Sequence, residues 1–108
     1  ESMVPEYNVY DMIIAKETDP STIVLGDDVV YLGKEADFRD KIVTHRIVDI
    51  KKSSDGYKFT TKGINNSIED PQIDENQIMG KVLFKSSILS FLSRIVNNIY
   101  GFYFIVFV

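Results

Sequence analysis

The sequence predicts a mainly β domain, built as an antiparallel sheet or a partly open β-barrel and followed by a C-terminal amphipathic helix. Short runs of β-branched and aromatic residues recur between turn signals up to residue 84. Asp55-Gly56 separates two such runs and is a strong hairpin signal. From Ser87 onward the apolar residues change to a helical period. We therefore expect a β-rich domain over residues 1–84 and a helix with an apolar, membrane-proximal tail over residues 85–108.

The first half of the chain alternates short strands with turns. Met12–Ala15 is an apolar run bounded by polar residues, and Pro20 then favours a turn. A brief strand, a turn at Gly26-Asp27 and a second strand over Val29–Leu32 follow. The charged segment 34–41 is expected to be a solvated loop.

A hairpin is expected in the middle of the chain, with strands over residues 42–50 and 57–62. Folding it about the centre of its turn places His45 roughly opposite Lys62. The segment "GINNSIEDP" that follows is rich in loop-forming residues and leaves the sheet beside His45. At about 3.3 Å per residue it is long enough to turn back over the imidazole. Residues 77–84 supply a last short strand.

The predicted helix has one apolar and one polar face. Its apolar residues recur three and four apart, at Ile88, Phe91, Leu92, Ile95, Val96 and Ile99. Such a helix either packs on the sheet or lies at a membrane surface, and the apolar ending "IYGFYFIVFV" favours the membrane. That ending is shorter than the roughly 20 residues that span a bilayer. We expect the chain to be a piece of a longer, membrane-attached protein.

Composition excludes several classes of function. The 108 residues contain 12 basic and 16 acidic side chains, for a net charge of −4, and the basic residues are scattered. Nucleic acid is therefore not an expected partner, because phosphate binding needs a basic patch. The absence of cysteine rules out thiol catalysis, and one histidine leaves too few ligands for structural zinc. We expect no metal and no cofactor.

The one histidine of the chain, His45, lies in a run of β-branched residues. On a strand it shares a face with Val43, Ile47 and Asp49, because alternate side chains point the same way. Apolar neighbours limit water around the imidazole and favour its neutral, proton-accepting form. A base of this kind activates a serine, and a carboxylate on its other nitrogen fixes the tautomer. By composition alone, however, a structural role for His45 is the simpler interpretation.

Five short motifs give the sequence a family resemblance. They are "SMVP" (2–5), "GDDVVY" (26–31), "VTHRIVDI" (43–50), "TKGINNSIEDP" (61–71) and "IMGKVLF" (78–84). In this order they resemble the motifs of type I signal peptidases. The family has a lysine branch and a histidine branch, the latter in the endoplasmic reticulum, archaea and some Gram-positive bacteria. With His45 in the third motif, the chain resembles the histidine branch.

The resemblance implies a membrane-bound serine endopeptidase with three catalytic residues. Ser2 matches the nucleophile, His45 the general base and Asp70 the orienting acid. The implied partners are secretory or surface-protein precursors with signal peptides and the lipid membrane, with the catalytic domain on the extracytoplasmic or lumenal side. An extended substrate would pair with a sheet edge. Met3 and Val43 are candidate walls of its side-chain pockets, although core residues would look the same.

Three positions depart from the family pattern. Glu1 stands where glycine is usual, Val4 where glutamate is common, and Ile64 replaces the aspartate of K-G-D-N-N. These departures motivate an alternative: a catalytically weak relative that binds exported precursors and assists the assembly of surface structures. Loss of cleavage on replacing Ser2 or His45 would distinguish the peptidase from this binding protein.

Overall fold

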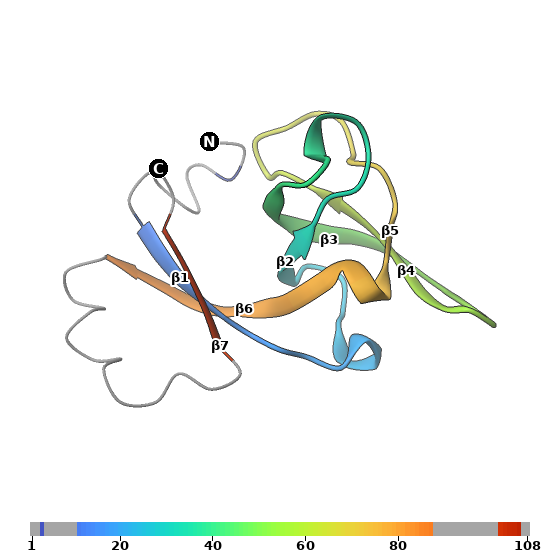
Figure 1. Ribbon diagram of the computed structural model, residues 1–108, viewed down its shortest axis with the longest axis horizontal. Coiled ribbons are helices and arrows are strands. Elements are labelled where there is room, and N and C mark those ends of the chain that lie inside the picture. The colour runs from blue at the N-terminus through green and yellow to red at the C-terminus, as the bar shows by residue number, and fades with distance from the viewer. Residues whose placement is uncertain (1–2, 4–10, 88–101, 107–108) are drawn as a thin grey trace.

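Antiparallel strands dominate the chain, as predicted (Figure 1). The computed structural model describes residue 3, residues 11–87 and residues 102–106. The strands are β1 (Asp11–Lys16), β2 (Asp28–Leu32), β3 (Ile42–Ser53), β4 (Gly56–Lys62), β5 (Ile73–Asp74), β6 (Ile78–Ser87) and β7 (Phe102–Val106). Three short 3-10 turns connect them: η1 (Pro20–Thr22), η2 (Ala36–Phe38) and η3 (Glu75–Gln77).

The strands form one open sheet in the order β5-β4-β3-β2-β6-β1-β7. Every described pairing is antiparallel, which confirms that part of the predicted fold class. The helix and tail are predicted over residues 85–108, and residues 88–101 of that range lie outside the described residues. Residues 85–87 belong to β6 instead. Residues 102–106, which belong to the predicted tail, form β7 and pair with β1 at the edge of the sheet.

The brief strand predicted before Gly26 is wrong. Residues 23–25 are irregular, and Val24 and Leu25 are 57% and 63% exposed. Asp27 explains the difference, because its carboxylate accepts the Val24 N–H at 2.9 Å and its own N–H donates to the Val24 carbonyl at 3.1 Å. These bonds close a turn around Gly26, whose φ of 92° suits glycine. The N–H and carbonyl groups of Val24 are therefore bonded within the turn and are not free to pair with a neighbouring strand.

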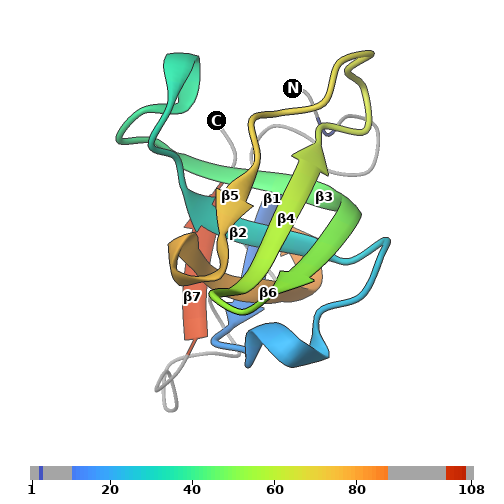
Figure 2. The ribbon, with the colours of Figure 1, turned by 90° about the vertical axis from the view of Figure 1, so that its right-hand side faces the viewer.

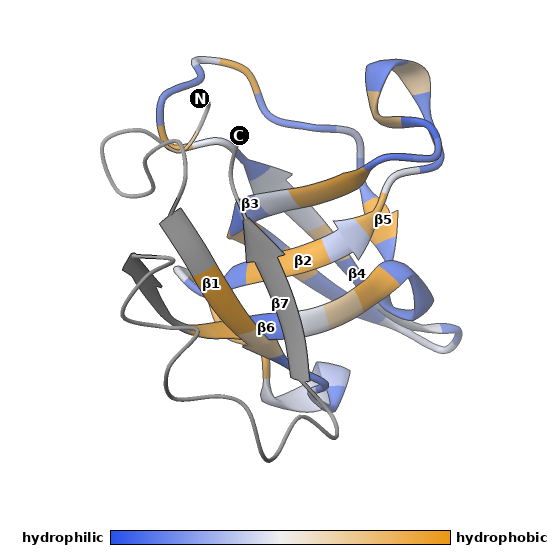
Figure 3. Ribbon diagram, turned by 60° about the vertical axis from the view of Figure 1, so that its left-hand side comes forward, coloured by the Kyte–Doolittle hydropathy of each residue, from blue (hydrophilic) through white to orange (hydrophobic). Residues whose placement is uncertain are grey.

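Two apolar clusters hold the sheet. The first contains Ile23, Val29, Tyr31, Val43, Ile47, Phe59 and Ile73, and the second contains Met3, Ile13, Ala15 and Val30. Successive residues of β2 alternate between them, so β2 is buried on both faces, which explains its unbroken apolar run. Figure 3 shows hydrophobic positions along β1, β2 and β3 and mostly polar residues in the loops. Burying such a side chain fully contributes about 1.5–3 kcal/mol.

The central hairpin pairs β3 with β4 as predicted, within one residue of the expected register. Arg46, rather than His45, lies opposite Lys62. A bulge then shifts the register between Ile47 and Asp49. Asp49 is consequently exposed and Ile50 packs against the first cluster, so the prediction that Asp49 shares the face of His45 is wrong.

Candidate active site

His45 is buried on β3, where it is 4% exposed. It lies opposite Val29 of β2, on the face that carries the first apolar cluster. Its Nδ1 lies 2.5 Å from Oδ2 of Asp70, a residue 25 positions later in the chain. The structure therefore brings together the predicted base and the predicted orienting acid.

Asp70 reaches His45 because the loop after β4 turns back on itself. The Asn66 N–H donates to the Gly63 carbonyl at 2.9 Å, which starts the turn. The Asp70 N–H donates to the Thr61 carbonyl, also at 2.9 Å, and so returns the chain to the end of β4. Asp70 is 8% exposed, and a buried carboxylate needs donors around it.

Two buried hydroxyl groups lie beside the carboxylate of Asp70. Thr61 Oγ1 donates to Asp70 Oδ2 at 2.7 Å. The Tyr31 hydroxyl lies 3.0 Å from Thr61 Oγ1 and 3.5 Å from Asp70 Oδ2. Burial, with a smaller contribution from the nearby Asp70 carboxylate, raises the pKa of Tyr31 to about 12, although the hydrogen bond with Thr61 opposes the shift. Tyr31 therefore stays protonated and able to donate at neutral pH.

Sequence reasoning did not identify Tyr31 and Thr61 as site residues. Tyr31 sits in an unbroken apolar run and Thr61 in an alternating strand pattern, and core packing explains both residues equally well. A signal was nevertheless present in Tyr31, because a tyrosine in a strand that is buried on both faces needs a hydrogen-bond partner for its hydroxyl.

Phe38 covers the imidazole from a loop that was expected to be only a solvated connection. Its ring meets the His45 ring edge-on, with centroids 5.8 Å apart and an interplanar angle of 88°. Loop 33–41 is closed by backbone bonds, including Gly33 N–H to Lys41 O at 2.8 Å. A Cβ on Gly33 would lie 2.1 Å from the Phe38 carbonyl oxygen, so only glycine fits there. Ala36, at φ 52°, adds backbone strain of a kind that clusters at functional sites.

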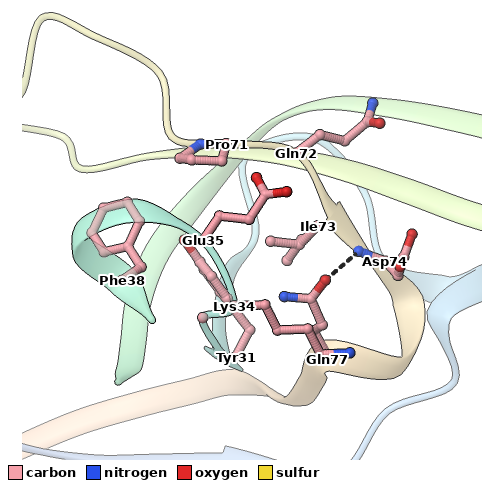
Figure 4. Close-up of a pocket in the computed structure, with 10 residues that line it drawn as sticks. Tyr31, Lys34, Glu35, Phe38, Pro71, Gln72, Ile73, Asp74 and Gln77 are labelled. Carbon is pink, nitrogen blue, oxygen red and sulfur yellow. Dashed lines mark hydrogen bonds between the residues drawn. The ribbon is translucent and has the colours of Figure 1, made fainter. Parts of the chain in front are cut away.

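The loops that carry Phe38 and Asp70 lie side by side at one end of the sheet (Figures 1 and 2). Between them is a groove of about 530 Å³, lined by Ala36, Asp37 and Phe38 on one side and by residues 65–71 on the other. A second pocket, of about 340 Å³, shares Phe38 and Pro71 with this groove (Figure 4). Tyr31 and Phe38 both line this pocket, and Gln77 accepts the Asp74 N–H at 2.9 Å beside it. Asp70 therefore borders the groove, and Tyr31 borders the second pocket.

Ile64 does not prevent Asp70 from reaching His45. Its side chain is half-buried against the second apolar cluster, which includes Met3. Its N–H donates to the Met3 sulfur at 3.4 Å. Where the family has a polar residue, Ile64 thus links the Asn-rich loop to Met3.

The other predicted site residues have different outcomes. Ser2 lies outside the described residues. Met3 and Val43 are 3% and 7% exposed and belong to the second and first clusters respectively, so the structure does not bring them together. Their role as pocket walls stays a prediction.

An ion pair on the opposite face fixes the strand that carries His45. Arg46 donates to both carboxylate oxygens of Asp28, from Nε at 2.7 Å and from Nη2 at 3.1 Å. Asp28 and Arg46 are also register partners in the β2 and β3 ladder. This bidentate contact favours one register, and a slip by one residue would turn His45 away from Asp70.

Comparison with known proteins agrees with the resemblance found in the motifs. Over 78 residues the chain is 44% identical to Signal peptidase I W of Bacillus subtilis (strain 168). The match covers 69% of this chain and 39% of the relative, so the chain spans well under half the length of that protein. This similarity supports a relationship to type I signal peptidases, which are hydrolases that process signal peptides. No protein-family model matches the chain, and no solved structure matches it significantly.

Within the described ranges, no three His, Cys, Asp or Glu residues gather in a way that would hold a metal ion. The same residues include no helix that is long and apolar enough to cross a membrane.

Proposed function

We propose that the chain is the catalytic part of a membrane-bound serine endopeptidase of the histidine-type signal peptidase branch. It removes signal peptides from secretory or surface-protein precursors with Ser2, His45 and Asp70. The observation that carries the proposal is the buried contact between His45 Nδ1 and Asp70 Oδ2 at 2.5 Å. The similarity to Signal peptidase I W supports the substrate class.

The contact defines what His45 does in the reaction. A carboxylate at Nδ1 favours the tautomer that carries its proton on Nδ1 and its lone pair on Nε2. Nε2 then takes the proton of Ser2 as the hydroxyl attacks the carbonyl of the scissile bond. The imidazolium that forms is stabilised by Asp70, and it returns the proton to the leaving amine.

The second half of the reaction releases the acyl group from the enzyme. The scissile C–N bond has broken, and the acyl group of the signal peptide is joined to Ser2 Oγ as an ester. His45 then activates a water molecule that hydrolyses this ester, which releases the signal peptide and restores the Ser2 hydroxyl. The negative charge on the carbonyl oxygen needs a donor in both steps, and the backbone N–H of Ser2 is the candidate. No metal or cofactor takes part in this scheme.

The substrate is bound as an extended segment along a sheet edge, near the groove between the loops of Phe38 and Asp70. Backbone pairing accepts varied sequences, whereas shallow pockets admit only small side chains at the residue before the cut and two positions upstream of it. Met3 and Val43 are the proposed walls of these pockets. The cut is made on the extracytoplasmic or lumenal side of the membrane, where the precursor emerges.

The proposal is tested with the full-length protein in lipid vesicles and a signal-peptide precursor as substrate. We expect Ser2→Ala and His45→Ala each to lower kcat/KM by at least about 10²-fold. Cleavage that survives both changes would exclude the mechanism. Tight precursor binding without cleavage by the parent would favour the alternative, a binding protein that assists surface assembly.

A further inference from the structure

The hydroxyl groups of Tyr31 and Thr61 are buried beside Asp70, and the mechanism gives them no function. These residues are 1% and 0% exposed. Both hydroxyls lie within 3.5 Å of Asp70 Oδ2, the same oxygen that contacts His45. Three polar groups from β2, β3 and β4 thus converge on one carboxylate oxygen.

The directions of these hydrogen bonds follow from the chemistry of the groups. An ionised carboxylate can only accept hydrogen bonds, so the hydroxyl proton of Thr61 is donated to Asp70. Thr61 must then accept from Tyr31, which it contacts at 3.0 Å. Tyr31 remains protonated to well above neutral pH, because burial raises its pKa to about 12. The chain of donors therefore runs from Tyr31 to Thr61 to Asp70.

Thr61 holds Asp70 at two points. Its carbonyl oxygen accepts the Asp70 N–H at 2.9 Å, and its hydroxyl donates to the Asp70 side chain at 2.7 Å. The first bond positions the backbone of Asp70 and the second selects its rotamer. Since Thr61 is a fully buried residue of a paired strand, its own position is rigid.

We propose that Thr61 and Tyr31 are positioning residues, which aim the Asp70 carboxylate at His45 Nδ1 and so select the tautomer of the imidazole. Their effect on turnover rests on the proposed peptidase function. Their effect on the imidazole does not, and can be observed in the absence of any substrate. Charge-assisted bonds of this kind are about twice as strong as neutral ones, so losing one would loosen the carboxylate.

The test uses NMR of the only imidazole in the sequence, together with kinetics. Thr61→Val removes the hydroxyl and keeps the shape, Thr61→Ser keeps the hydroxyl, and Tyr31→Phe removes only the outer donor. Thr60→Val, one residue earlier on β4, and Tyr57→Phe are the matched controls. The readouts are the Nδ1–H resonance and 15N tautomer shifts of His45, and kcat and KM for precursor cleavage.

We expect Thr61→Val to shift the Nδ1–H resonance upfield, to mix the two tautomers and to lower kcat about 10-fold with KM unchanged. Tyr31→Phe should show the same changes to a smaller extent, while Thr61→Ser and both controls should match the parent. A parental His45 spectrum in both Thr61→Val and Tyr31→Phe would overturn the proposal. If Thr61→Val does not fold, Tyr31→Phe decides alone. A parent that does not cleave would count against the peptidase, yet the NMR comparison would still decide the positioning role.

Discussion

Replacing Asp70 by asparagine removes one charge and almost no volume. In the parent, Asp70 Oδ2 lies 2.5 Å from His45 Nδ1, which places the two charge centres about 4 Å apart once the imidazolium forms. At an effective dielectric constant near 20, that attraction is worth about 4 kcal/mol. One factor of ten in rate corresponds to about 1.36 kcal/mol, so we expect Asp70→Asn to lower kcat/KM roughly 10³-fold.

The assay is steady-state cleavage of a fluorogenic signal-peptide substrate by the full-length protein. Asp49→Asn is the matched control, because Asp49 is an exposed carboxylate on the same strand as His45. We expect the control to stay within a factor of two of the parent. If Asp70→Asn retains a third or more of parental kcat/KM while Ser2→Ala is inactive, the assigned role of Asp70 is refuted.

Three further predictions concern the framework of the site. Gly33→Ala should displace Phe38 and cost about 1–3 kcal/mol by denaturant unfolding, since the added Cβ would lie 2.1 Å from the Phe38 carbonyl oxygen; unchanged stability would contradict this packing. Ile64→Ala should cost about 1–2 kcal/mol through lost contacts with the cluster of Met3, whereas Ile68→Ala, 77% exposed on the same loop, should stay within about 0.5 kcal/mol. For Tyr31 the folded pKa, about 12, exceeds the ordinary value of 10.0, so its contribution to stability is complete below about pH 10 and is lost as the pH rises towards 12. Tyr31→Phe should reduce this alkaline slope, and an unchanged slope would contradict the burial of the hydroxyl.

The sequence predicted the parts of the site that depend on local chemistry. Asp55-Gly56 defined the hairpin, and the Asn-rich segment after Lys62 identified the loop that returns to His45. Both signals act over a few residues, because turn residues determine which backbone conformations are accessible. The pairing of His45 with Asp70 followed from these two features and from the family resemblance.

What the sequence did not reveal depends on contacts between distant segments. The bulge at Val48 places Ile50 rather than Asp49 over the core, and only the sheet as a whole determines it. The contact of Phe38 with His45 could not be predicted from the charged segment around Phe38, because it requires loop 33–41 to fold over β3. Tyr31 and Thr61 looked like ordinary strand residues because their hydroxyls meet Asp70 only after three strands have paired.

The most direct test of the proposed mechanism is mass spectrometry of the enzyme after a single, rapidly quenched turnover. We expect an ester between the signal peptide's C-terminal carboxyl group and Ser2, formed by the parent and absent from His45→Ala. Cleavage of the precursor without a Ser2 ester, or an ester on another residue, would contradict the Ser2, His45 and Asp70 mechanism.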